Sequence, residues 1–134
     1  MPLIRKAGAR DARALAQLAE RTFRETFAAE NRAEDLELHC RSSYGEALQA
    51  RELAAPDLTT FVAEDASTLV GFAQVRRGRA PGCVRAEAPG EVQRLYVSGE
   101  WHGRGVAQRL MHACLEELAA RGADVAWLGV WERN

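Results

Sequence analysis

A strand, a short loop and a glycine-flanked helix start follow one another in one stretch of this 134-residue chain. The strand covers residues 91–97 (Glu-Val-Gln-Arg-Leu-Tyr-Val), and the helix is predicted to begin beside Gly103 and Gly105. The first N–H groups of a helix have no partner within it, and the helix dipole adds roughly half a positive charge there. Glycines remove the Cβ atoms that would keep an anion away. This stretch is therefore predicted to bind a phosphate group through its main chain.

The spacing resembles motif A of the GNAT superfamily of N-acetyltransferases, in which Gln or Arg, two variable residues, Gly, one residue and Gly or Ala bind the pyrophosphate of acetyl-coenzyme A. The matching segment is His-Gly-Arg-Gly-Val-Ala at 102–107, and His102 stands where the family usually has Gln or Arg. The resemblance runs from Leu3 to Asn134. It implies an α/β fold with a mixed sheet, the GNAT-like acyl-CoA N-acyltransferase fold, as a single domain over residues 1–134.

The same resemblance implies which residues bind the coenzyme. Residues 102–108 form the cradle for the pyrophosphate, the backbone of the preceding strand binds the pantetheine arm and the thioester carbonyl, and the Asn at the end of the chain touches the arm. The coenzyme-binding residues expected on this basis are Leu95, Tyr96, Val97, His102, Gly103, Arg104, Gly105, Val106, Ala107, Gln108 and Asn134.

Composition is typical of one soluble globular domain, with 47% apolar and 28% charged residues. The formal net charge of −1 predicts no general attraction to nucleic acid or to anionic membranes. No apolar run approaches the roughly 20 residues of a membrane span, and the start of the chain lacks a secretory signal, so we expect a cytoplasmic protein. Three distant cysteines and three dispersed histidines favour neither disulfides nor a metal site.

The first half of the chain is predicted to hold a strand, helices and then a hairpin. Asp11 is expected to cap a helix that reaches about Ala28, and Ser43 to start another with Glu46 as its capping-box partner. The predicted elements are a strand at Leu3–Ala7, helices at 11–28, Arg32–His39 and from Ser43 to before Pro56, and strands at Thr60–Ala63 and Leu69–Val75 around a turn at 64–68.

The second half is predicted to hold a loop at Gly78–Gly90, the strand at 91–97, a long helix and a last strand. The long helix has one apolar face and ends at Gly122, which supplies a left-handed residue. A last strand at Val125–Trp131 should pair parallel to the strand at 91–97, because a helix crosses between them.

Members of the resembled family usually continue past the residue matching Asn134 into a helix that carries a general-acid tyrosine and into a last hairpin. The sequence has no residue that matches this tyrosine, so none is assigned, and the fold is expected to lack the C-terminal helix and last strands. The last strand would then expose an edge and the side chains of Trp127 and Trp131. We therefore expect either a shortened product of a longer gene or a partner chain, such as a homodimer, on this edge.

Acetyl transfer to an amine requires a base, because an alkyl amine with a pKa near ~10 is mostly protonated at pH 7. Glu91 lies near the position where some family members carry such a carboxylate, and its alternative role is that of a solvated strand-end glutamate. The acceptor is expected to be a small-molecule amine or a peptide amine. Phe27, Glu30 and Asn31 are the candidate acceptor-binding residues, and their surroundings look like the polyamine-type branch, although glutamates on a short helix are usually a solvated face.

Two other functions fit parts of the sequence. Gly103-Arg-Gly105 before a helix is similar to a dinucleotide-binding fingerprint, but Gln108 replaces its third glycine and about five residues separate strand from helix. An acetyl-coenzyme A sensor or an inactive fragment without turnover is the other alternative. Neither a hydrolase nucleophile elbow nor a nucleotide-triphosphate phosphate loop is present in the sequence.

Overall fold

The computed structural model describes residues 2–27, 45–55, 58–77, 89–123 and 125–128. Five strands form one sheet in the order β1-β2-β3-β4-β5, antiparallel up to β4 and parallel between β4 and β5. The strands are β1 (Leu3–Lys6), β2 (Leu58–Asp65), β3 (Thr68–Arg77), β4 (Pro89–Val97) and β5 (Val125–Leu128). This mixed sheet confirms the predicted fold class.

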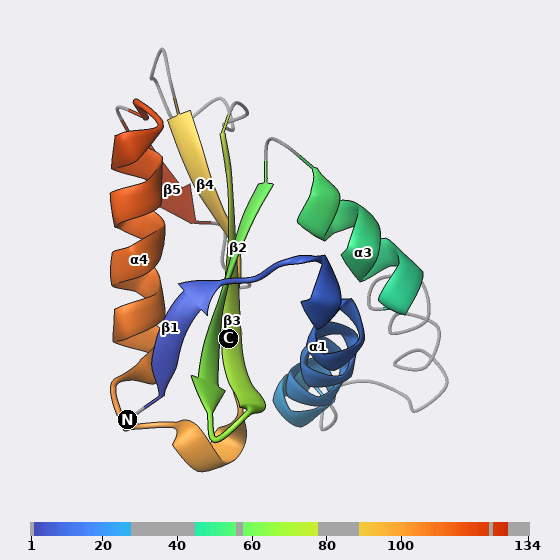
Figure 1. Ribbon diagram of the computed structural model, residues 1–134. Helices are drawn as coiled ribbons and strands as arrows, with labels where there is room; N and C mark the ends of the chain where they lie inside the picture. Colours follow the sequence, from blue (N-terminus) through green and yellow to red (C-terminus); the bar gives the residue numbers. More distant parts are fainter. Residues whose placement is uncertain (1, 28–44, 56–57, 78–88, 124, 129–134) are drawn as a thin grey trace.

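Helices cover both faces of the sheet, with α4 on one face and α1 and α3 on the other (Figure 1). The α-helices are α1 (Ala12–Phe27), α3 (Glu46–Ala54) and α4 (Val106–Ala120), and the 3-10 helices are η1 (Ala9–Asp11) and η3 (Gly99–Trp101). None of the helices in the described residues is long and apolar enough to cross a membrane.

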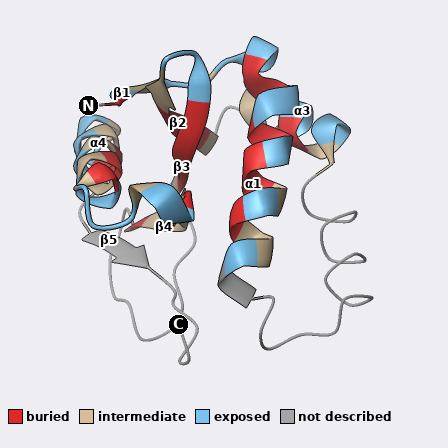
Figure 2. Cartoon of the chain, turned by 90° about the horizontal axis from the view of Figure 1, so that it is seen from below, coloured by how far each residue is buried: buried red, intermediate tan, exposed pale blue. Residues whose placement is uncertain are grey.

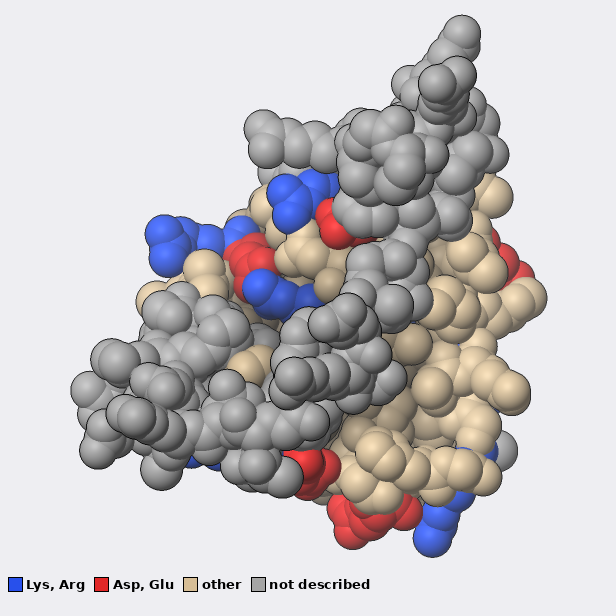
Figure 3. Space-filling model, turned by 180° about the vertical axis from the view of Figure 1, so that it is seen from behind, with Lys and Arg blue, Asp and Glu red and all other residues tan. Residues whose placement is uncertain are grey.

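Two apolar clusters join these layers, and the buried faces of the helices turn toward the sheet (Figure 2). Under α4 the fully buried residues include Leu110, Cys114 and Val75. Under α1 they include Leu15 and Phe72. Because each β-strand sends alternate side chains to opposite faces, the single sheet supplies both clusters. On the face drawn in Figure 3, basic and acidic side chains lie next to one another, and beside them is an extended area without charged side chains.

The predicted turn between the second and third strands is confirmed, and it is tighter than expected. Ala66 and Ser67 both have positive φ, at 48° and 70°. Two consecutive left-handed residues form the type of two-residue turn whose twist matches that of a hairpin. The hairpin strands therefore extend to Asp65 and resume at Thr68.

Several predicted boundaries were wrong. The helix expected from Ser43 begins at Glu46, with Gly45 as an extended N-cap without a side-chain cap, so Glu46 is the first helical residue rather than a capping-box partner. Strand β4 begins at Pro89 rather than at residue 91, since proline is tolerated as the first residue of a strand. The predicted helix at Arg32–His39 lies outside the described residues, as does the final part of the last predicted strand.

Asp11 directly precedes α1, close to the predicted helix start. Its carboxylate does not cap the first turn of α1 and instead accepts hydrogen bonds from other groups. Its two oxygens accept hydrogen bonds from Arg5 at 2.9 and 3.0 Å, and Oδ2 also accepts from the N–H of Gly8 at 2.8 Å. The Asp11 side chain is 8% exposed. The hydrogen bonds from Arg5 hold the pKa of Asp11 below its usual value. This pair therefore fixes β1 to the start of α1.

We expect Asp11→Asn to lower the unfolding free energy at pH 7 by about 1–3 kcal/mol, because a buried charge-assisted hydrogen bond is lost. A carboxylate with a lowered folded-state pKa stabilises the fold above its unfolded pKa of about 3.9, and this contribution disappears as the pH falls through the folded-state pKa. Urea unfolding at pH 7 and at pH 2–3 should therefore show a difference between wild type and variant that shrinks in acid. A pH-independent difference would contradict this account.

Candidate functional site

The cradle predicted from the sequence lies at the start of α4, where the chain turns twice through left-handed conformations. Gly103 has φ of 76°, and Gly105, the N-cap of α4, has φ of 81°. A Cβ atom built on either glycine would meet no atom within 4 Å, so both positions face open space. Only glycine adopts such angles without strain. The backbone is thus exposed to any ligand at this point.

Most main-chain donors of the cradle have no well-aligned acceptor in the described part of the chain. The N–H groups of Trp101 and His102 donate to carbonyls within the preceding turn, and the N–H of Arg109 donates to Gly105 O at 3.1 Å. Between these, the N–H groups of residues 103–108 make no well-aligned hydrogen bond within the described residues. Such a row of donors at a helix N-terminus attracts anions.

A cavity of about 370 Å³ opens at these donors. It lies between the end of β4 and the first turn of α4. Its lining residues are Val97, Trp101, His102, Gly103, Gly105, Val106, Ala107 and Gln108. The structure therefore brings together seven of the predicted coenzyme-binding residues, together with Trp101, which the sequence analysis did not select.

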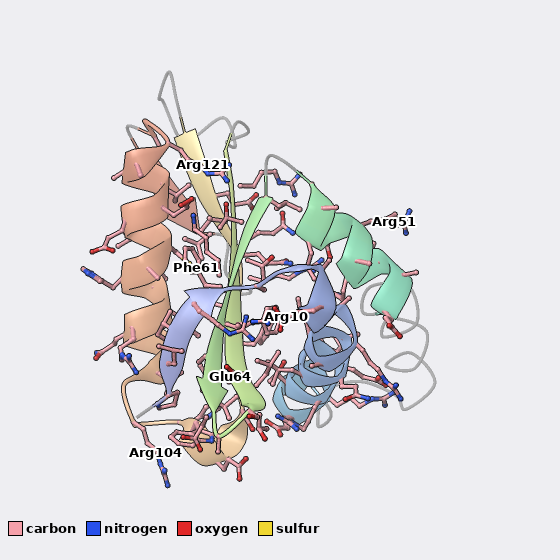
Figure 4. All side chains as sticks on the ribbon, viewed as in Figure 1. Arg10, Arg51, Phe61, Glu64, Arg104 and Arg121 are labelled. Atoms are coloured by element: carbon pink, nitrogen blue, oxygen red, sulfur yellow. The ribbon has the colours of Figure 1, made fainter. Side chains whose placement is uncertain are left out.

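Two charged or polar side chains of the cradle, His102 and Arg104, contact other groups of the protein. His102 Nε2 lies 2.8 Å from the carbonyl oxygen of Val97, and since a carbonyl only accepts, this nitrogen carries the proton. The guanidinium of Arg104 stacks over the ring of Trp101 with its carbon 4.8 Å from the centroid. Figure 4 shows Arg104 extending outward at this end of the molecule.

The strand before the cavity carries a β-bulge. The pairing of β3 and β4 passes from Gln74–Arg94 to Val75–Val92, which leaves Gln93 as an extra residue in β4. Toward α4, Val92 and Leu95 pack in one cluster although they are three residues apart. The bulge thus changes which residues face each side of the sheet.

Beyond the bulge, main-chain groups of β4 point toward the β5 edge. The N–H of Ser98 donates to Val70 O on β3, so by alternation Leu95 and Val97 direct their N–H and C=O groups the other way. The described pairing of β4 with β5 ends at Val92–Leu128. Tyr96, which lies between Leu95 and Val97 in the strand, stacks its ring on that of Phe72, with the ring centroids 5.7 Å apart. Burial raises the pKa of Tyr96.

Glu91 lies at the opposite end of β4 from the cavity. It pairs in register with Arg76, and because Val92 packs toward α4, Glu91 lies on the face that carries α1 and α3. Glu91 is partly exposed. Six residue steps of extended chain, about 20 Å, separate it from Val97. A ligand that joins the cradle to this carboxylate must be long and extended.

A buried polar network on the same face was missed by the sequence analysis. Arg94 Nη1 donates to Glu52 of α3 at 3.0 Å and to Gln74 at 3.1 Å, and Gln74 Nε2 donates to Thr60 at 3.3 Å. Gln74 is completely buried. Gln74 is the only polar side chain in the otherwise apolar run 69–75, and this could have indicated the network, because a buried amide needs hydrogen-bond partners.

Comparisons with known proteins agree with this architecture. The profile of the acetyltransferase (GNAT) family matches residues 12–134. An uncharacterised N-acetyltransferase of Mycobacterium tuberculosis is 31% identical over 124 residues, which are 92% of this chain and 75% of that protein. This chain belongs to the GNAT family of acetyltransferases. A second relative, an uncharacterised N-acetyltransferase of Lactobacillus delbrueckii subsp. lactis, is 24% identical over 87% of this chain and 68% of that protein.

Solved structures share the fold of this GNAT chain. The PaiA N-acetyltransferase of Thermoplasma acidophilum, solved in complex with coenzyme A, superposes with a TM-score of 0.86 over all of this chain and 82% of that chain, at 22% identity. The aminoglycoside N-acetyltransferase AAC(6')-Iy, also in complex with CoA, gives a TM-score of 0.77 over all of this chain and 80% of that chain, at 14% identity.

The dinucleotide-binding alternative was wrong. A doubly wound dinucleotide fold has a mostly parallel sheet and turns directly from strand to helix. In this GNAT chain only β4 and β5 are parallel among the described strands, and η3 separates β4 from the cradle.

Some predicted site residues cannot be placed. Phe27 is the last residue of α1, and its side chain lies outside the described part of the structure, as do Glu30, Asn31 and Asn134.

Within the described residues there is no cluster of three metal-binding side chains. Cys114 is fully buried in the α4 cluster, and burial raises the pKa of its thiol to about 12.

Proposed function

We propose that this protein transfers an acetyl group from acetyl-coenzyme A to a primary amine, with both substrates bound together in a ternary complex. The observation that carries this proposal is the row of N–H groups at residues 103–108, which have no well-aligned acceptor among the described residues and lie beside a cavity. A diphosphate suits these donors because it offers several acceptor oxygens and negative charge at a helix N-terminus. The open Cβ positions of Gly103 and Gly105 fit close approach of such a group.

The remaining coenzyme contacts would follow β4. The main-chain groups of Leu95 and Val97 point toward the β5 edge, so an extended pantetheine arm can add hydrogen bonds along this strand. A main-chain N–H of this strand would stabilise negative charge on the acetyl oxygen, a contact worth roughly 2.7–4 kcal/mol when it can be removed. His102 already binds Val97 O, so the arm must share or displace that bond.

The coenzyme supplies an activated acetyl thioester, and the protein supplies position and a base. When the amine attacks, a C–N bond replaces the C–S bond, the electron pair leaves with sulfur, and Glu91 accepts the amine's proton directly or through water. Glu91 lies on the sheet face opposite α4, about one strand length from the cradle. Holding both substrates together supplies much of the rate.

For the acceptor we propose a small-molecule amine or a peptide amine, bound near the segment that holds Phe27, Glu30 and Asn31. The aminoglycoside acetyltransferases among the structural neighbours support a small-molecule amine. The sequence that follows Phe27 carries the acidic residues Glu30, Glu34, Asp35 and Glu37, and this negative charge suits a polycationic acceptor such as a polyamine. Thiol release should be measured with polyamines, aminoglycosides, amino acids and peptides in parallel.

Calorimetry and thiol release together test this function. We expect acetyl-coenzyme A to bind and NAD not to bind, and at least one amine to release thiol in step with its acetylation. Binding without thiol release from any acceptor would favour an acetyl-coenzyme A sensor, the alternative kept from the sequence. Failure to bind acetyl-coenzyme A at millimolar concentration would refute the proposal.

Gly105→Ala is expected to weaken acetyl-coenzyme A binding about tenfold or more, because the new Cβ occupies the space in front of the cradle donors. The left-handed angle of 81° also adds strain of about 1 kcal/mol. Calorimetry measures the affinity, and urea unfolding measures the strain.

Gly122→Ala provides a matched control. Gly122 also has φ of 81° and open space at its Cβ position, but it ends α4 instead of beginning it. Both variants should lose similar stability, and only Gly105→Ala should lose affinity. Equal loss of affinity in the two variants would mean that general destabilisation, and not the cradle, is responsible.

A further inference from the structure

The turn that leads into the cradle is held by a side chain from a distant helix. The N–H of Gly99, the first residue of η3, donates to Glu25 Oε2 at 2.9 Å. Glu25 lies in the last turns of α1, whose C-terminal end runs beside η3 (Figure 1). The two residues are 74 positions apart in the sequence.

This exposed contact gives the first N–H group of η3 a side-chain acceptor. Its N-cap, Ser98, makes no side-chain cap and donates its own N–H to Val70 O, while Trp101 and His102 donate within the turn. The N–H at the start of a helical turn needs an acceptor from elsewhere. Glu25 therefore supplies the cap that η3 lacks from its own sequence.

Helix α1 is a rigid support for this cap. Leu15, Leu18 and Ala19 are almost completely buried against the sheet, so the helix backbone is fixed by the core. By contrast, η3 has no buried residue. Hydrogen bonds from a rigid element to the segment beside a binding site help to hold that site in its binding geometry.

We propose that Glu25 is a positioning residue for the coenzyme, and this inference rests on the proposed function. By fixing Gly99, Glu25 keeps η3 in the orientation from which the N–H groups of residues 103–108 face the cavity. Its own charge does not favour an anionic ligand, and the guanidinium of Arg21 lies 4.0 Å away. The useful contribution is the hydrogen bond, which a neutral side chain can also make.

The test compares Glu25→Ala with Glu25→Gln, whose amide oxygen still accepts from Gly99. Glu20→Ala is the matched control, because Glu20 is similarly exposed on α1, at 45% against 41% for Glu25, and pairs with Arg24. In each protein, amide hydrogen exchange at Gly99 is measured without ligand, followed by the Kd and KM for acetyl-coenzyme A and by kcat.

Glu25→Ala should speed exchange at Gly99 and raise Kd and KM for acetyl-coenzyme A about fivefold, with kcat changed less than about twofold. Glu25→Gln should match wild type or bind slightly more tightly, and Glu20→Ala should match wild type. The inference is overturned if Glu25→Ala binds as Glu20→Ala does, or if Glu25→Gln is as weak as Glu25→Ala. If wild type binds no acetyl-coenzyme A, the proposed function fails with it, whereas failure of the Glu25 series alone leaves that function standing.

Discussion

Glu91→Gln should lower kcat about 100-fold, the low end of the range for loss of a general base. The amide keeps the size of the carboxylate but cannot accept a proton from the attacking amine. Binding of acetyl-coenzyme A should stay within about twofold, since Glu91 lies at the far end of β4 from the cradle. Steady-state kinetics with the amine found in the thiol-release screen, together with calorimetry, measure both quantities.

The pH dependence adds a second, independent readout for Glu91. Without a base the reaction depends on amine that is already neutral, and that fraction rises tenfold per pH unit below the amine pKa of about 10. The deficit of Glu91→Gln should therefore shrink as the pH rises. Glu100→Gln, which removes an exposed carboxylate close to the cradle, should keep the wild-type kcat. An unchanged kcat in Glu91→Gln would leave Glu91 as a solvated strand-end residue.

Phe72→Ala should lower the unfolding free energy by about 3–5 kcal/mol. Phe72 is completely buried at the centre of the cluster that holds α1 and α3 against the sheet, and its ring stacks on Tyr96. Removal of the ring leaves a cavity that close-packed neighbours fill only in part. Urea unfolding followed by circular dichroism measures the loss.

Phe72→Leu is the control for this prediction, because it keeps most of the buried apolar volume and should cost much less than the alanine variant. Similar losses in the two variants would indicate that the aromatic stack with Tyr96, rather than the filled volume, dominates. A loss below about 1 kcal/mol in Phe72→Ala would contradict the role of this residue in the core.

Local rules made much of the fold predictable from the sequence. Gly122 was predicted to supply a left-handed residue after α4 and has positive φ, and Gly103 and Gly105, selected for their missing Cβ atoms, have positive φ as well. The apolar face of α4 was visible at helical spacing, and its residues Leu110, Cys114 and Leu118 are buried. Boundaries were less predictable where neither turn chemistry nor periodicity was distinctive, as at Ser43 and Pro89.

The sequence by itself determined the position of the cradle, because backbone angles and unpaired helix donors depend on residues close in the chain. The tertiary structure alone decided the long-range polar contacts around the cradle. Arg94 joins two strands to α3, and Glu25 caps a turn 74 residues away. These partners meet only after the sheet and helices have packed, so no local pattern in the sequence could specify them.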